Sequence, residues 1–216
     1  MSLSKVLITG SSKGLGYYLA KYYASKGHSV ILHGRNEERL EKVNKEIKKI
    51  NNSSEYYISD LENTNEVINF SNFAIKKNVK ILINNAGIIC PGVPFKKINI
   101  VTIKKMIDVN IAAPIMLINL LRDNIDQVIN INSMVGLETK KNRTMYAATK
   151  WGLKGFSDSL KKEENTYNVL DVYPTNIRTW PERDNAMDVN FVIDKIYSSM
   201  LAKDKELILD GRINDY

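Results

Sequence analysis

The chain has 216 residues, 44% of them hydrophobic, so it can bury one sizeable core and is expected to form a single domain over residues 1–216. Its formal net charge of +7 comes from lysines and arginines spread along amphipathic segments rather than one basic block, which argues against nucleic acid as a partner. One cysteine, Cys90, excludes an internal disulfide framework, and no Cys/His cluster has zinc-ligand spacing, so no metal site is expected.

The first residues, MSLSKVLITG, lead directly into an apolar strand and lack the regions of a secretory signal. The most apolar run, residues 109–121, is interrupted by Asn110, Pro114 and Asn119 and falls short of the roughly 20 residues that a membrane span needs. We therefore expect no membrane contact and a cytoplasmic location.

Short apolar runs alternate with longer amphipathic segments along the whole chain. In residues 36–50, for example, Leu40, Val43, Ile47 and Ile50 lie three or four positions apart and form one apolar stripe. Repeated strand–helix–strand order predicts an α/β fold, a doubly wound parallel sheet with helices on both faces. The expected strands are 5–9, 29–33, 55–59, 80–83, 128–132, 168–173 and 206–209, and the expected helices are 14–26, 36–50, 64–77, 102–121, 146–164 and 188–200.

A glycine-rich turn follows the first strand, in residues 9–16 (TGSSKGLG). Glycines let the backbone approach a phosphate closely, and the start of the next helix offers free N–H donors. The spacing differs from the commoner G-x-G-x-x-G pattern, and an ordinary strand-to-helix turn is the alternative interpretation. The turn residues expected to contact a dinucleotide are Gly10, Ser12, Lys13, Gly14, Leu15 and Gly16.

Charge at the end of the second strand indicates which dinucleotide binds. A free ribose 2′-hydroxyl is usually held there by a carboxylate, but this chain has His33-Gly34-Arg35-Asn36 at that point. Arg35 can bind a phosphate with paired hydrogen bonds, and Lys13 is expected on the same side. NADP(H) is therefore favoured over NAD(H), the alternative being that Arg35 is an ordinary solvated residue.

Tyr146 and Lys150 are four residues apart, which on a helix places them on one face about 5–6 Å apart. An opposite charge at that separation, at an effective dielectric near 20, is worth roughly 3 kcal/mol and moves the pKa of a phenol from about 10 toward 8. Such a phenol can act as an acid or base near neutral pH. The pattern Tyr-x-x-x-Lys also occurs by chance on helix surfaces, so it needs further context.

That context comes from polar residues at strand ends and in one helix. Asp60 ends the third strand, Asn84-Asn85-Ala86-Gly87 follows the fourth, and Ser133 follows the fifth. Together with the glycine turn, these residues resemble the compact branch of the short-chain dehydrogenase/reductase family. The motifs that carry the resemblance, in family order, are residues 9–16, Asp60, 84–87, Asn110, Ser133, Tyr146, Lys150 and the segment containing Pro174, Ile177 and Thr179.

The resemblance implies a Rossmann sheet of about seven parallel strands and a role for each motif. By this resemblance Tyr146 exchanges a proton with the substrate oxygen, Ser133 orients that oxygen, Lys150 holds the nicotinamide ribose, and Asn110 anchors a relay water. Further cofactor contacts are implied for Asp60, Asn85, Ala86, Gly87, Ile177 and Thr179.

The chain departs from the family pattern in three places. Thr175 follows Pro174 where relatives usually have glycine, which makes the position of Thr179 less certain. The stretch from Asn110 to Ser133 is short, which trims the helix that commonly builds the dimer interface in this family. A homo-oligomer is therefore one of the open alternatives. Only a dozen residues, 175–186, stand where many relatives have a lid, so we expect an open site.

Loop position places Cys90, Pro91, Met134, Tyr173 and Trp180 around the substrate pocket. Lys140, Lys141 and Arg143 precede Tyr146 and predict either an anionic or carrier-linked substrate or only a solvated basic loop.

Three functions stay open. The favoured one is NADP(H)-dependent interconversion of a small-molecule carbonyl and an alcohol, with a 3-oxoacyl-thioester reductase as its named variant. The others are a dinucleotide-binding regulator without turnover and a nucleotide-sugar epimerase or dehydratase, which generally needs a longer C-terminal domain.

Overall fold

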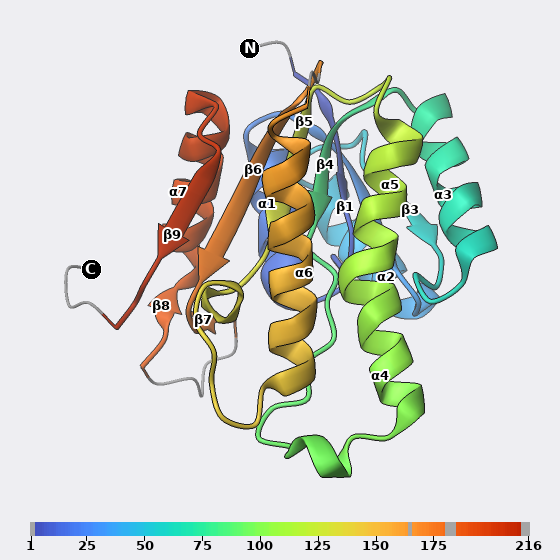
Figure 1. Cartoon of the computed structure of the whole chain (residues 1–216). Helices are drawn as coiled ribbons and strands as arrows, with labels where there is room; N and C mark the ends of the chain where they lie inside the picture. The colour runs from blue at the N-terminus through green and yellow to red at the C-terminus, as the bar shows by residue number, and fades with distance from the viewer. Residues whose placement is uncertain (1–2, 164–165, 180–184, 213–216) are drawn as a thin grey trace.

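The computed structural model describes residues 3–163, 166–179 and 185–212 (Figure 1). Seven parallel strands form one sheet in the order β3-β2-β1-β4-β5-β6-β9, which confirms the doubly wound parallel sheet. Most of these strands are buried on both faces, as their nearly unbroken apolar runs require. The strands are β1 (Lys5–Ile8), β2 (Ser29–Gly34), β3 (Glu55–Ile58), β4 (Val79–Asn84), β5 (Gln127–Ile131), β6 (Asn168–Pro174) and β9 (Glu206–Leu209).

Helices cover both faces of the sheet and bury two apolar layers. Helices α1 (Gly14–Ser25), α2 (Glu37–Lys48) and α7 (Val189–Ala202) pack on one face, where Leu19, Leu40 and Val192 join the strand side chains. The opposite layer includes Phe70 and Leu117. The helices on that face are α3 (Thr64–Lys76), α5 (Ala113–Leu121) and α6 (Thr144–Leu160), with α4 (Ile100–Ile107) extending from α5 (Figure 1).

The structure differs from the expected elements in a few segments. The expected helix 102–121 is divided into α4 and α5 by one π-helical turn, Asp108–Ala112. A small parallel sheet of β7 (Ile177–Arg178) and β8 (Met187–Asp188) was not predicted. The expected helix 146–164 begins earlier, at Thr144, and ends earlier, at Leu160; Glu164 lies outside the described ranges. Short 3-10 turns form at Phe95–Lys97 and Met134–Gly136.

The helices differ in whether a side chain caps their N-terminal N–H groups. Asn36, Asn63, Asn99 and Asp188 accept backbone N–H groups at the starts of α2, α3, α4 and α7. Helices α1 and α6 have no such cap and no acidic residue in the first turn. Their N-terminal N–H groups therefore remain available to other acceptors. None of the helices in the described ranges is both long and apolar enough to cross a bilayer.

His33 links the carboxyl ends of three strands. Its Nδ1 accepts the Gly10 N–H at 3.1 Å, and its Nε2 lies 3.1 Å from the Ser59 carbonyl oxygen. Since a backbone N–H can only donate, the ring is neutral with its proton on Nε2, which donates to Ser59. The imidazole is 2% exposed and stacks on Phe70 with ring centroids 4.7 Å apart. A second proton on this ring would face the Gly10 N–H.

Replacing His33 with Gln should reduce the dependence of stability on pH. Burial lowers the pKa of His33 from 6.5 to about 4, so the unfolded chain binds more protons than the native chain between these values. The contribution of His33 to the free energy of unfolding is therefore fully present above pH 6.5 and is lost as the pH falls. Between pH 7.5 and pH 5 this loss is about 2 kcal/mol. Urea unfolding at a series of pH values measures the slope.

His28→Gln, which changes the chain's other histidine, serves as the comparison and should keep most of the slope. Equal pH slopes in the His33→Gln variant and the unchanged protein would contradict this account of His33.

Candidate active site

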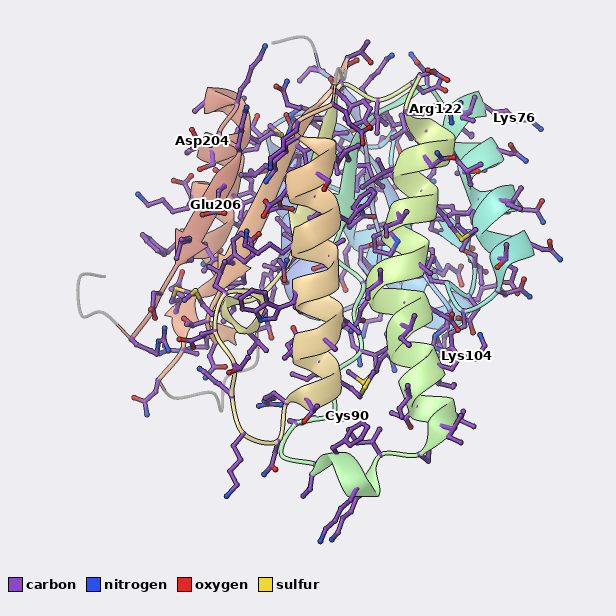
Figure 2. All side chains as sticks on the ribbon, viewed as in Figure 1. Lys76, Cys90, Lys104, Arg122, Asp204 and Glu206 are labelled. Atoms are coloured by element: carbon purple, nitrogen blue, oxygen red, sulfur yellow. The ribbon has the colours of Figure 1, made fainter. Side chains whose placement is uncertain are left out.

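Two cavities adjoin at the carboxyl ends of the central strands, where ligands bind in open α/β sheets. The first measures about 390 Å³ and the second about 510 Å³, and they share Leu15, Asn85 and Gly87 in their walls. Cys90 lies at this same end of the molecule, opposite Arg122 (Figure 2). The first cavity is lined by Gly10, Ser12, Lys13, Gly14, Leu15, Arg35, Asp60, Asn85, Ala86 and Gly87, all expected cofactor residues, and by His33, Gly34, Leu61, Ile88 and Val109.

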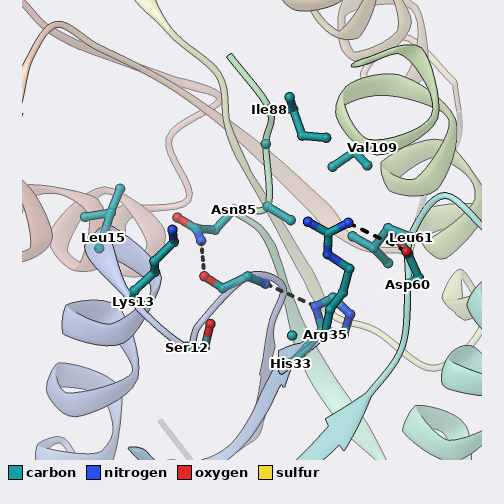
Figure 3. A pocket seen from close by; sticks show the side chains of 15 residues that line it. Ser12, Lys13, Leu15, His33, Arg35, Asp60, Leu61, Asn85, Ile88 and Val109 are labelled. Carbon is teal, nitrogen blue, oxygen red and sulfur yellow. Dashed lines mark hydrogen bonds and ion pairs between the residues drawn. The ribbon is translucent and has the colours of Figure 1, made fainter. Parts of the chain in front are cut away.

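Asn85 and Thr9 hold the glycine turn against the end of β4. The Asn85 amide donates to the backbone oxygens of Thr9 and Gly10, at 2.9 and 3.1 Å (Figure 3 shows the bond to Gly10). In return, Thr9 Oγ1 accepts the N–H groups of Asn85 and Ala86. A Cβ on Gly16 would lie 2.5 Å from the Asn85 amide nitrogen, so only glycine fits there. Gly16 thus permits this packing and does not line either cavity.

The turn itself is shaped to admit a phosphate group. Gly14 has a φ of +58°, and a Cβ built on it would meet no atom within 4 Å, so its Cα faces open space. Helix α1 begins at this residue with uncapped N–H groups, and Lys13 lines the cavity beside it. These residues fit the pyrophosphate of a dinucleotide.

Arg35 lies at the end of β2 among carboxylates. Its Nη1 is 3.1 Å from Glu62 Oε1 and 3.6 Å from Asp60 Oδ2 (Figure 3 shows Asp60). Lys105 contacts the other oxygen of Glu62 at 3.2 Å. Arg35 and Lys13 both line the first cavity, so two cations face a space that also has a negative wall.

Tyr146, Ser133 and Lys150 meet below the second cavity. Tyr146 and Ser133 line it, and Ser133 acts on the Tyr146 hydroxyl by lowering its pKa. Lys150 is buried, with Nζ donating to the Ile131 carbonyl oxygen at 2.8 Å and lying 5.7 Å from the centre of the Tyr146 ring. Ile131 ends β5 and Ser133 follows it, so the sheet positions both partners of the α6 residues. Among the described residues, the Ile131 carbonyl oxygen is the one hydrogen-bond acceptor of the ammonium, which leaves two of its three N–H groups.

Burial controls the proton affinity of both α6 residues. Burial raises the pKa of Tyr146, and the hydrogen bond from Ser133 and the charge of Arg143 oppose this rise. The pKa of Lys150 is lowered to about 8 by burial. The expectation that Lys150 brings the pKa of Tyr146 toward 8 is therefore wrong for the chain alone, because desolvation outweighs the neighbouring charges.

Asn110 occupies the π turn, and its amide is used within the protein. Its Oδ1 accepts the Ile88 N–H at 2.7 Å, and its Nδ2 donates to the Ile88 carbonyl oxygen at 2.8 Å and to Thr149 Oγ1 at 3.1 Å. Thr149 in turn donates to the carbonyl oxygen of Tyr146. The Asn110 amide thus joins α6 to the segment after β4, and Asn110 is 1% exposed.

The remaining expected residues are divided between the cavities and the interior. Ile177, Thr179, Pro91 and Met134 line the second cavity. Cys90 is not in its wall, and Tyr173 is fully buried elsewhere. Trp180 lies outside the described residues, and the expectation of an open site rests on a segment that includes residues 180–184, also outside them.

Sequence reasoning missed the site contributions of His33, Thr9, Glu62 and Thr149. The histidine's position at the end of a strand was visible, but nothing in the sequence indicates that its ring accepts the Gly10 N–H. Glu62 lies 27 residues after Arg35, and only the fold brings them together. Thr175 pairs with β9 through its N–H to Leu209, at 2.9 Å, and so extends β6 where glycine was expected.

Residues 4–188 match the short chain dehydrogenase family. A nodulation protein G from Rhizobium sp. (strain N33) and a 3-oxoacyl-(acyl-carrier-protein) reductase from Aquifex aeolicus are each 33% identical over 172 residues, 76% of this chain and 69% of theirs.

Solved structures agree with the family match. A bulky-bulky ketone specific alcohol dehydrogenase from Comamonas testosteroni superposes with a TM-score of 0.89 at 26% identity, covering 96% of this chain and 86% of its own. A short-chain dehydrogenase from Sphingobium yanoikuyae in complex with NADPH gives 0.84 at 25% identity, covering 98% and 89%. The chain therefore belongs to the short-chain dehydrogenases and is an oxidoreductase of that family.

Proposed function

We propose that this protein interconverts a small-molecule carbonyl compound and its alcohol with NADP(H). The observation that carries this proposal is the placement of Tyr146 and Ser133 in the wall of one cavity that adjoins a second, phosphate-adapted cavity. The relatives support it, since they include a ketone-specific alcohol dehydrogenase and a 3-oxoacyl reductase. A 3-oxoacyl thioester is the named variant of the substrate.

A nicotinamide dinucleotide supplies or accepts the hydride when bound. Its phosphates fit the start of α1, with Lys13 and the open face of Gly14 beside them. The two N–H groups of Lys150 that bond no described residue are available to hydroxyl groups of the nicotinamide ribose. Asp60, Asn85, Ala86, Gly87, Ile177 and Thr179 would complete the cofactor contacts.

Side chains of the protein carry out the proton transfer. In the reducing direction, the Tyr146 hydroxyl gives its proton to the carbonyl oxygen, while Ser133 Oγ hydrogen-bonds the same oxygen. The raised pKa of Tyr146 keeps its proton in place until the oxygen becomes basic. Asn110 acts as a positioning residue, because its amide joins Ile88 to Thr149, which bonds the Tyr146 carbonyl oxygen.

The preference for NADP(H) rests on Arg35. A 2′-phosphate would meet its guanidinium, which can form two parallel, charge-assisted hydrogen bonds with phosphate oxygens. Glu62 and Asp60 compete for the same guanidinium before the phosphate arrives. Lys105 already contacts Glu62, so the displaced carboxylate keeps a cation.

Replacing Tyr146 with Phe should abolish turnover and spare NADPH binding, because only the proton-carrying hydroxyl is removed. Turnover should fall by roughly 100-fold or more, in line with general acid–base contributions of that order. NADPH absorbance with a panel of ketones and aldehydes measures turnover, and fluorescence titration measures cofactor binding.

Tyr56→Phe removes a hydroxyl from β3, away from both cavities, and should leave turnover unchanged. Ordinary rates in the Tyr146→Phe variant would mean that the acid lies elsewhere. Absence of any turnover in the unchanged protein would favour the regulator without turnover.

Replacing Arg35 with Asp should reverse the cofactor preference. The substitution removes the phosphate partner and adds a charge that repels it, so NADPH affinity should fall by about tenfold or more while NADH affinity is kept or rises. Dissociation constants for both cofactors, measured by titration, give the ratio.

Lys48→Asp makes the same change of charge at the exposed end of α2 and should leave that ratio unchanged. Equal affinities for NADPH and NADH in the unchanged protein would contradict the proposal that Arg35 binds the 2′-phosphate.

A further inference from the structure

Three cations line the cavity that contains Tyr146, and they differ in their partners. Lys140 lies 3.1 Å from Glu138, and Arg212 lies 2.7 Å from Glu138 and 2.6 Å from Asp210. Arg143 makes no ion pair with any described residue. Its Nη1 is buried and has no hydrogen-bond partner in the described part of the chain. Among the described residues, Arg143 is thus the one cation of this cavity without a counter-charge.

An unpaired guanidinium of this kind is costly for a protein. Arg143 is half-buried, and its buried Nη1 forfeits the hydrogen bond that it would make to water. Arg143 also directly precedes α6, whose positive end has neither a side-chain cap nor an acidic first turn. Both features favour an anion in the cavity, and no described side chain supplies one.

The position of Arg143 relative to Tyr146 defines where that anion would lie. Arg143 directly precedes α6, and Tyr146 lies in the first turn of this helix, three positions later. Both line the same cavity. The charge of Arg143 also acts on Tyr146, whose pKa it lowers against the effect of burial.

We propose that Arg143 is a specificity-determining residue that binds the carboxylate of a short-chain oxo acid whose carbonyl oxygen lies at Tyr146 and Ser133. This inference rests on the proposed function and names its substrate class. Reduction adds a hydride from NADPH to the carbonyl carbon and a proton from Tyr146 to the oxygen, giving a hydroxy acid and NADP⁺. The carboxylate is unchanged and serves only to hold the substrate.

The test compares oxo acids with their neutral methyl esters, using pyruvate, acetoacetate and levulinate, in which the carboxylate lies progressively farther from the carbonyl. The unchanged protein should reduce at least one acid with a higher kcat/KM than its ester. Arg143→Gln should lower kcat/KM for that acid by roughly 10- to 100-fold, mainly through KM, and change the ester little. Arg143→Lys should retain part of the preference, because the charge remains without the planar fork.

Lys141→Gln is the matched control, since it removes an exposed charge from the same loop, and it should alter neither substrate. Thermal unfolding and NADPH titration of each variant show whether the fold and the cofactor site are retained. If Arg143→Gln proves unstable, Arg143→Lys and Lys141→Gln carry the comparison.

Binding without turnover separates this proposal from the proposed function. Calorimetry of the Tyr146→Phe variant with NADPH and each acid should show binding that Arg143→Gln removes. If an acid binds through Arg143 but the unchanged protein reduces no substrate, the proposed function is overturned and the role of Arg143 is supported. Reduction of ketones with no difference between acid and ester, or no Arg143-dependent binding of any of the three acids, would overturn the proposal.

Discussion

The site depends on hydrogen bonds that tie the carboxyl ends of neighbouring parallel strands together. Thr9, at the end of β1, bonds the backbone after β4 through its hydroxyl, and Asn85 returns a bond to the Thr9 carbonyl oxygen. His33 joins the same turn to β2 and to the segment after β3. Because all these strands point the same way, one short network fixes the floor of the first cavity. A turn that binds phosphate must leave space that side chains would otherwise occupy. Its conformation is therefore held by hydrogen bonds from Thr9, Asn85 and His33.

The parts of the fold that sequence predicts are those set by local patterns. All seven sheet strands lie where apolar runs predict them, and the glycine turn follows from residues 9–16. The π turn at Asp108–Ala112 was not predictable, because an extra residue in a helical turn leaves no periodic signal in so short a segment. The two-residue strands β7 and β8 are too short to show alternation. Pairs such as Arg35 and Glu62 depend on how the third strand and the loop after it are placed in space.

The spacing of Tyr146 and Lys150 correctly predicted that they share a face, but spacing carries no information on burial. In a solvated setting, Lys150 would act as a cation beside the phenol and lower its pKa. In the fold Lys150 is 4% exposed, and burial lowers its pKa to about 8 while raising that of Tyr146. The sign of the result follows from desolvation, which acts on both groups and favours their neutral forms.

The charge of Arg143 acts on the proton of Tyr146, in addition to the role in carboxylate binding that we propose for it. A guanidinium stays charged at any physiological pH, whereas a buried ammonium with a lowered pKa does not. Before substrate binds, the charge of Arg143 favours loss of the Tyr146 proton. A carboxylate on Arg143 would cancel that influence and strengthen the hold of Tyr146 on its proton. An acidic substrate would thus arrive with the counter-charge that keeps the phenol protonated, which is the state that reduction of a carbonyl requires.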